Sequence, residues 1–281
     1  MTATQSAAMA AINARAGTDG SRAIEYLSPA MPVRMADLWF DIASLEHFWI
    51  QRRFEVFRQF CGKLISSAGE VAEIGCGPGL LQRQIEDKYR KPVTGFDLNE
   101  HGLKHNVSRI SRLCCYDIHQ RNVELRGKFS VILLFDVLEH IPDEERFLNA
   151  VLFHLAPQGR LILNVPAGRW AFSEYDTAAG HVRRYAPKDL RGVALRNKLE
   201  IEKWTYWGIP LLPTLALRKL VLMGKHDQCQ IISMGFDSKA LWINKVLGTL
   251  ARLEWIPQTL AGSSLMAVLR VAEGRSAQPA S

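Results

Sequence analysis

Apolar residues follow two alternating patterns along the 281-residue chain, short continuous runs and stretches with helical periodicity. A continuous apolar run between turn residues is typical of a strand buried on both faces of a parallel sheet, and residues 129–135 are the clearest case. Shorter runs of this kind cover residues 71–74, 92–96, 113–116 and 160–165. Because helical patterns separate these runs, the sequence predicts an α/β fold with a doubly wound sheet.

A helical pattern also precedes the first of these strands, from Tyr26 to Ile65, and its apolar positions are largely aromatic. We expect these N-terminal helices to pack on the sheet or to close over a ligand bound at its edge. Asp41 and His47 lie within this stretch and could reach such a site.

The C-terminal part contains two more strand-like runs, residues 199–206 and 264–271, separated by an insertion at 207–262. Within the insertion, residues 215–223 and 237–253 have helical patterns, and its apolar content exceeds what a surface loop needs. We predict a helical insertion that covers a binding site or contacts a membrane surface or a second subunit. The alternative is a plain helical layer on the sheet.

The two ends of the chain differ in composition from the part between them. Residues 1–20 and 273–281 are rich in small and polar residues, which predicts disorder and leaves one domain at 21–272. No apolar run reaches the roughly 18 residues of a membrane span, and residues 1–20 lack the apolar core of a secretory signal.

The charge balance narrows the range of partners. Lys and Arg number 35 against 28 Asp and Glu, a net charge of +7, but no run of five basic residues occurs. The excess favours an anionic partner but is too diffuse to indicate a nucleic-acid binder. The five cysteines include no C-x-x-C pair, so we expect neither a zinc site nor a disulfide framework, and we expect a reducing, cytoplasmic location.

A glycine-rich turn joins the strand at 71–74 to the next helical pattern. Gly75, Gly77 and Gly79 permit positive φ angles and let a ligand approach the amides that begin the helix. A dinucleotide site would require a glycine where Leu80 stands, and its pyrophosphate would be repelled by Glu73. A cationic amino acid joined to adenosine would tolerate that carboxylate, which favours S-adenosylmethionine.

The second strand ends in Asp97, where a carboxylate can accept both ribose hydroxyls; capping the next helix is the alternative role. Glu73, the three glycines and Asp97 together resemble motifs I and II of the class I S-adenosylmethionine-dependent methyltransferases. The resemblance implies a Rossmann-like seven-stranded sheet whose last strand is antiparallel. It also implies that Asp117 and Ile118 contact the adenine, although Asp117 could instead make a local turn. The cofactor-binding residues predicted in this way are Glu73, Gly75, Cys76, Gly77, Gly79, Asp97, Leu98, Asp117, Ile118 and Phe135.

The sequence D-V-L-E-H at 136–140 resembles the segment after the fourth strand in small-molecule members of this family. In some quinone-directed relatives an acid-rich version holds a divalent metal. No further ligand is evident here, so we expect no metal. Glu139 and His140 could instead cap and orient the loop.

The segment 170–185 combines aromatic, acidic, imidazole and guanidinium groups. An imidazole suits proton removal near neutral pH, so we predict His181 as the general base, oriented by Asp176, with His140 as the alternative base. Tyr175 lies beside them. Residues predicted to bind the acceptor are Trp170, Arg183, Arg184 and Tyr185. The competing interpretation is that this loop is only tied to the sheet by hydrogen bonds.

Residues 47–49 and 180–185 look similar to a small-molecule-directed bacterial subgroup of the family, which leaves the acceptor open. We predict methyl transfer to oxygen or nitrogen of a small-molecule acceptor, including anionic, lipid-linked or glycan-linked ones. A nucleic-acid or protein methyltransferase is the second hypothesis. Against it, residues 136–139 lack the Asn/Asp-Pro-Pro-aromatic pattern that is typical of base and amide N-methylation. The third is a module that binds S-adenosylmethionine without turnover.

Overall fold

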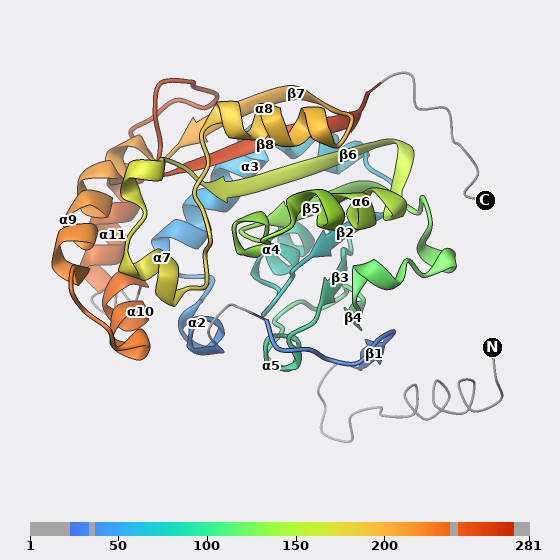
Figure 1. Ribbon diagram of the computed structural model, residues 1–281, viewed down its shortest axis with the longest axis horizontal. Coiled ribbons are helices and arrows are strands. Elements are labelled where there is room, and N and C mark those ends of the chain that lie inside the picture. Colours follow the sequence, from blue (N-terminus) through green and yellow to red (C-terminus); the bar gives the residue numbers. More distant parts are fainter. Residues whose placement is uncertain (1–22, 34–36, 237–240, 273–281) are drawn as a thin grey trace.

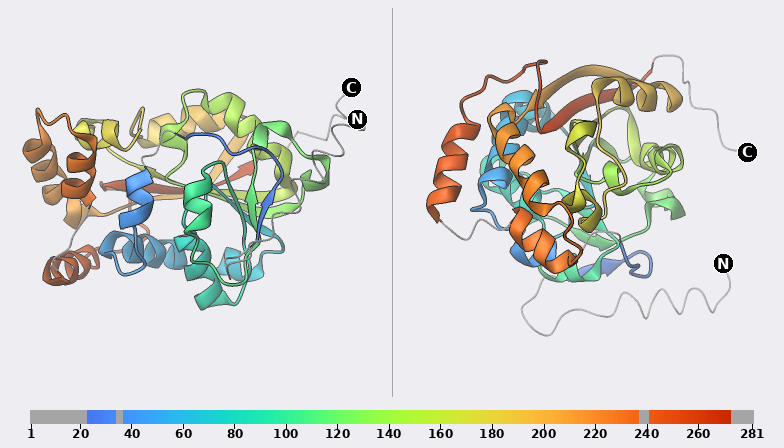
Figure 2. Two further views of the ribbon diagram at one scale, coloured as in Figure 1. Left: turned by 90° about the horizontal axis from the view of Figure 1, so that it is seen from below. Right: turned by 60° about the vertical axis from the view of Figure 1, so that its left-hand side comes forward.

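The computed structural model describes residues 23–33, 37–236 and 241–272, and the segments predicted to be disordered lie outside these ranges. A central sheet carries helices on both faces, so the molecule has three layers (Figure 1). Seen along the edge of the sheet, α6 and α8 lie on one side and α3 and α4 on the other (Figure 2). This arrangement confirms the doubly wound α/β prediction.

The sheet has the strand order β1-β4-β3-β2-β5-β6-β8-β7. Strand β8 pairs antiparallel with both β6 and β7, and the other pairs are parallel. The seven predicted strands are all present, and the short β1 adds an eighth at the edge. Their bounds are β1 Ile24–Tyr26, β2 Val71–Ile74, β3 Thr94–Asp97, β4 Leu113–Cys115, β5 Phe129–Phe135, β6 Leu155–Pro166, β7 Leu199–Trp207 and β8 Ser264–Val271.

Each face of the sheet has its own hydrophobic core. On one face, α6 (Glu144–His154) and α8 (Pro187–Arg196) pack on β2, β5, β6 and β8. On the other, α3 (Phe48–Ser67) and α4 (Leu80–Tyr89) pack on the same strands. Strand β5 supplies both cores because its successive side chains point to opposite faces and six of its seven residues are buried.

The N-terminal helical prediction is wrong in its first part. Tyr26 ends β1, which pairs with β4, and the helices that follow are α2 (Asp37–Ile42) and α3. Helix α5, which follows β3, spans only Glu100–Lys104. Beyond it, the carboxylate of Glu86 accepts the backbone N–H groups of Arg109, Ile110 and Ser111, which holds that segment in a turn.

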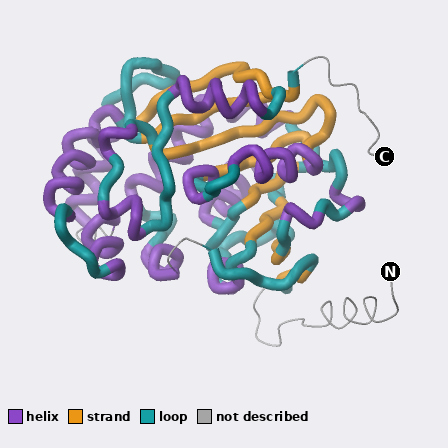
Figure 3. Tube along the Cα trace, viewed as in Figure 1, coloured by secondary structure: helices purple, strands orange, loops and turns teal. Residues whose placement is uncertain are grey.

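The insertion between β7 and β8 is helical, as predicted. Helices α9 (Leu212–Leu222), α10 (Gln228–Phe236) and α11 (Leu241–Ala251) form one end of the molecule, beyond the carboxyl ends of the parallel strands (Figures 1 and 3). Helix α10 had no counterpart in the sequence analysis. No helix in the described ranges is both long enough and apolar enough to cross a bilayer.

Candidate functional site

The glycine turn after β2 has the backbone conformation that its sequence predicts. Gly75, Gly77 and Gly79 have φ angles of 77°, 47° and 71°. A Cβ atom on Gly75 would lie 2.4 Å from Cγ2 of Val137, so a larger residue cannot stand there without a shift. The turn therefore brings backbone amides to the carboxyl edge of the sheet at the beginning of α4.

Asp97 braces this turn from the neighbouring strand. Its Oδ2 accepts the N–H of Gly77 at 2.7 Å and its Oδ1 accepts the N–H of Asn99 at 2.8 Å. Asn99, rather than Asp97, is the N-cap of α5, so the capping alternative does not describe Asp97. Burial raises the pKa of Asp97, although its backbone hydrogen bonds oppose this.

Three carboxylates meet at the ends of three adjacent strands: Glu73 in β2, Asp97 in β3 and Asp136 after β5. Glu73 is buried, and its Oε2 has no hydrogen-bond partner in the part of the chain that the structure describes. Burial raises the pKa of Glu73 to about 8; Arg53 opposes the rise, and the charges of Asp97 and Asp136 add to it. Such a concentration of acidic groups suits a cationic ligand.

A chain of hydrogen bonds fixes Asp136. Arg53 Nη1 donates to its Oδ2 at 2.5 Å, Asn164 Nδ2 donates to its Oδ1 at 2.8 Å, and Trp207 Nε1 donates to Asn164 Oδ1 at 2.9 Å. Asp136 has a φ angle of 58°, which is costly for a residue other than glycine. These contacts join α3 to the ends of β5, β6 and β7 and hold that strained residue in place.

The residues predicted to lie near the adenine, Asp117 and Ile118, and the cofactor-binding candidate Leu98 differ in burial and in local contacts. Asp117 Oδ1 accepts the N–H of His119 at 2.9 Å, the local turn contact that we had considered, and its own N–H donates to Ser28 Oγ at 2.8 Å. Ile118 is buried in the core below it, and Leu98 is half-buried. The adenine contact of Asp117 thus stays a prediction.

Cys76 and Phe135 complete the cofactor-binding residues that we had predicted. Both side chains are buried, and burial raises the pKa of the Cys76 thiol well above its ordinary value. The Phe135 ring packs edge-on against Phe57 with the ring centroids 5.4 Å apart. They shape the site by packing.

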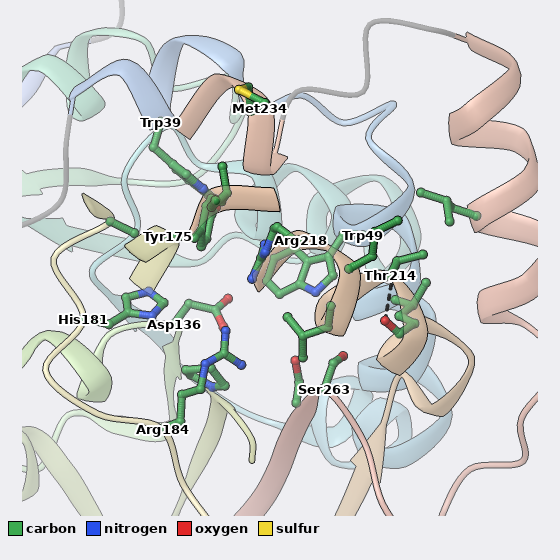
Figure 4. A pocket seen from close by; sticks show the side chains of 18 of the residues that line it. Trp39, Trp49, Asp136, Tyr175, His181, Arg184, Thr214, Arg218, Met234 and Ser263 are labelled. Carbon is green, nitrogen blue, oxygen red and sulfur yellow. Dashed lines mark hydrogen bonds between the residues drawn. The ribbon is translucent and has the colours of Figure 1, made fainter. Parts of the chain in front are cut away.

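A cavity of about 430 Å³ lies between the carboxyl edge of the sheet and the insertion helices. Its wall is mostly apolar and aromatic, with charged groups from the D-V-L-E-H segment, the loop after β6 and α9 (Figure 4). Asp136 lines it, so the cavity adjoins the acidic edge described above. The other polar and aromatic lining residues include Trp39, His47, Trp49, Glu139, Tyr175, His181, Arg184 and Arg218.

Asp176 organises the loop that contributes most of the predicted catalytic residues. It belongs to α7 (Glu174–Ala178) and is fully buried. Its Oδ1 lies 2.9 Å from His181 Nδ1, within hydrogen-bond distance, and forms an ion pair with Arg184 Nε at 2.8 Å. Burial alone would raise its pKa, but the hydrogen bond of His181 and the charge of Arg184 outweigh burial and hold the pKa at about 2. An ionised Asp176 assigns the proton of neutral His181 to Nδ1 and leaves Nε2 as an acceptor.

His140 stands beside His181, with the ring centroids 4.8 Å apart and the rings nearly perpendicular. Glu139 is buried between β5 and this loop, and burial, then the charge of Asp136, raises its pKa well above the ordinary value. One ligand atom each from Glu139, His140 and His181 lie within 4.8 Å of one another, a grouping that could hold a metal ion. The absence of a metal therefore stays a prediction.

Three of the residues predicted to bind the acceptor are not among those that line the cavity. Arg183 pairs with Glu144 of α6 at 2.7 Å, and the Tyr185 hydroxyl donates to the same carboxylate at 2.5 Å. Trp170 is exposed. For Arg183 and Tyr185 the competing interpretation, that the loop is tied down by hydrogen bonds, is the better one; Arg184 alone of the four reaches the cavity.

Arg218 also lines the cavity, although it was not among the predicted site residues. Its guanidinium carbon lies 3.9 Å from the centroid of the Tyr175 ring, and desolvation in the cavity wall lowers its pKa (Figure 4). The signal was present, because Arg218 and Lys219 interrupt an otherwise apolar helix. Trp39, Trp49 and Asp136 were missed as site residues because their segments meet only in the folded chain.

A Rossmann-like sheet with an acidic, glycine-lined edge beside an apolar cavity defines an enzyme that holds a cationic nucleoside cofactor next to its second substrate. The chain belongs to the family described as the methyltransferase domain, whose model matches residues 45–218, more than half of the chain. It is a class I methyltransferase, and its cofactor is S-adenosylmethionine.

Curated relatives agree with this assignment. The chain is 31% identical to a ubiquinone biosynthesis O-methyltransferase of Idiomarina loihiensis, over 42% of this chain and 51% of that protein. It is 30% identical to the enzyme of the same name from Marinobacter nauticus, over 36% of this chain and 45% of that protein. The chain thus spans about half the length of these curated relatives.

Among solved structures, phosphoethanolamine N-methyltransferase 2 of Haemonchus contortus in complex with S-adenosyl-L-methionine has a TM-score of 0.50. The two chains are 16% identical, and the match covers 85% of this chain and 58% of the other. At this identity the likeness concerns the fold alone.

Proposed function

We propose that this enzyme transfers the sulfonium methyl group to a hydroxyl oxygen of a small acceptor that has an apolar body and an anionic group. The observation that carries the proposal is His181, which lines the cavity and whose ring is held by the buried Asp176. Asp136 lines the same cavity and joins it to the cofactor edge, the glycine turn and the carboxylates at the ends of β2, β3 and β5. The names of the curated relatives, which are O-methyltransferases, support a hydroxyl acceptor.

The reaction is an in-line displacement. The acceptor oxygen attacks the methyl carbon, the bond from carbon to sulfur breaks, and S-adenosylhomocysteine leaves as a neutral thioether. His181 Nε2 takes the hydroxyl proton as the new bond forms. The ionised Asp176 holds Nδ1 and stabilises the resulting imidazolium, which later returns the proton to water.

The remaining walls of the cavity account for acceptor binding. Trp39, Trp49 and Leu215 offer flat and branched apolar surfaces to a ring or chain. Arg184 and Arg218 face the same space and would pair with a carboxylate or phosphate. Since Arg184 is already bound to Asp176, Arg218 is the better candidate for that contact.

The test begins with a screen, because the acceptor is unknown. Purified protein and S-adenosylmethionine are incubated with metabolite and lipid extracts, and products that gain the mass of one methylene are identified. The same assay is run on His181→Ala and on His226→Ala, an exposed histidine outside the cavity, as the matched control. The proposal is supported if product is lost with His181→Ala but not with His226→Ala. Cofactor binding with no product from any extract would contradict it and favour a non-catalytic module.

A further inference from the structure

The insertion presents apolar side chains to solvent on all three of its helices. Leu220 on α9 is 64% exposed, and Leu253, just after α11, is 72% exposed. The same exposed set includes Leu217, Val221, Met223, Met234, Val246, Leu250, Trp255 and Leu260. Soluble proteins expose single apolar residues commonly, but a concentration on one structural unit marks an interaction site.

These exposed residues are continuous with the acceptor cavity. Leu217 and Val221 of α9 and Met234 of α10 are exposed and also line the cavity. Leu247 of α11 also lines it. The cavity is therefore rimmed by apolar side chains where it meets the outside, and the close-up shows α11 set apart from the helices that carry Arg218 and Met234 (Figure 4).

The charge around this rim is positive. Residues 207–262 contain six Lys and Arg and three Asp and Glu, almost half of the net charge of the chain. Of the acids in the described part of the insertion, Glu254 is paired with Arg52, and Asp227 caps α10 by accepting the N–H of Gln230. Lys245 is exposed on α11. Arg252 is paired with Glu55, and Lys219 donates to the carbonyl of Trp170. The positive charge that the described insertion offers beside its apolar side chains therefore rests on Lys225 and Lys245.

We infer that the insertion docks this enzyme on an anionic phospholipid bilayer, with the mouth of the cavity turned toward the lipid. Apolar side chains would enter the headgroup region while basic groups pair with lipid phosphates, the combination by which peripheral proteins bind such surfaces. The inference rests on the proposed function, because it makes the acceptor a lipid-linked molecule that enters from the membrane. A second copy seated on this face would cover the mouth that the acceptor uses, which favours the bilayer as the occupant.

The test is sedimentation of the full chain with vesicles of phosphatidylcholine alone or mixed equally with phosphatidylglycerol. We expect binding to the mixed vesicles that weakens with added salt and is lost without the anionic lipid. Leu220→Glu and Leu253→Glu, neither of which lines the cavity, should each lower the partition coefficient about tenfold. Leu195→Glu is the matched control, since Leu195 is 80% exposed on α8, outside the insertion, and should bind within about twofold of wild type.

Three results would overturn the inference: no binding of the wild type to mixed vesicles, equal binding of the insertion variants, or a wild-type dimer in sedimentation velocity that the variants split. Affinity for S-adenosylmethionine is measured on every variant, and two insertion variants are used so that misfolding of one does not decide the result. Cofactor binding and turnover without vesicle binding would defeat the docking inference and leave the proposed function intact. Vesicle binding without turnover would leave the docking on lipid intact and defeat the proposed function.

Discussion

The cofactor edge and the acceptor cavity are adjacent but are built in different ways. The cofactor edge consists of backbone turns and carboxylates at the ends of three neighbouring parallel strands, β3, β2 and β5, which the sheet holds rigidly. The cavity is walled by side chains from α2, α3, α7 and the three insertion helices, which pack largely on one another. We therefore expect cofactor binding to depend on the sheet, and acceptor selection to depend on the helices added to it.

The largest effect should come from the cofactor edge. We expect Asp97→Ala to lower the affinity for S-adenosylmethionine by about thirty- to a thousandfold, or roughly 2 to 4 kcal/mol, as measured by calorimetry. The carboxylate is lost both as an acceptor for the ribose and as the brace of Gly77. Asp97→Asn keeps one side-chain oxygen, so its affinity for S-adenosylmethionine should lie between those of the wild type and Asp97→Ala. An unchanged affinity would remove Asp97 from the site.

The next effect belongs to the cavity and should leave the cofactor edge untouched. Once an acceptor is known, His181→Ala should lower kcat by about a hundredfold or more while the affinity for S-adenosylmethionine stays within about threefold. Asp176 holds only Nδ1 of His181, so Nε2 is the atom that we propose removes the proton. His140→Ala, measured in parallel, should change kcat much less. If the two variants behave in the opposite way, His140 is the base.

A pH experiment tests the acidic group of the cofactor edge. Burial raises the pKa of Glu73 to about 8, so below that pH the free enzyme holds a proton on Glu73. The ammonium group of the bound cofactor lowers this pKa, and binding then releases the proton. The affinity should rise about tenfold from about pH 6 to about pH 7.5, and Glu73→Gln should remove the dependence.

The same group affects the stability of the cofactor-free protein. Because the pKa of Glu73 is higher in the folded than in the unfolded chain, its contribution to the free energy of unfolding is present at low pH and is lost as the pH rises toward about 8. Glu73→Gln should flatten thermal stability over this range. Equal pH profiles for the two proteins would contradict the raised pKa.

The sequence predicts these two regions unequally. The glycine turn and Asp97 were found because their chemistry is local: the residue types and their spacing alone require positive φ and a strand end. Strand β1 was misread as helix because only its pairing with β4 makes it a strand. The link from Arg53 through Asp136 and Asn164 to Trp207 joins four distant segments, and no periodicity reveals it.

Acceptor binding gives a smaller effect. Arg218→Met should raise KM for an anionic acceptor about fivefold with little change in kcat, because Arg184 still faces the cavity. Lys219→Met, on the same helix but outside the cavity wall, is the control. Equal KM values for the two variants would leave Arg218 as a packing residue above Tyr175.

Removal of divalent metal ions should have the smallest effect. The sulfonium already activates the methyl carbon, and Asp176 already orients His181, so EDTA should leave the rate within about twofold. The prediction would be wrong if a metal ion were bound by Glu139, His140 and His181, whose ligand atoms lie close together. A metal at this position would be indicated if EDTA abolished the rate and one divalent ion restored it in the wild type. In Glu139→Gln the same ion should then fail to restore the rate.

A crystal structure of the enzyme with S-adenosylhomocysteine tests most directly the claim that the two regions form one active site. The account predicts that the ribose hydroxyls bind Asp97, that the amino group lies near Glu73, and that the sulfur faces the cavity that contains His181. A nucleoside bound elsewhere, or a sulfur turned away from His181, would contradict it.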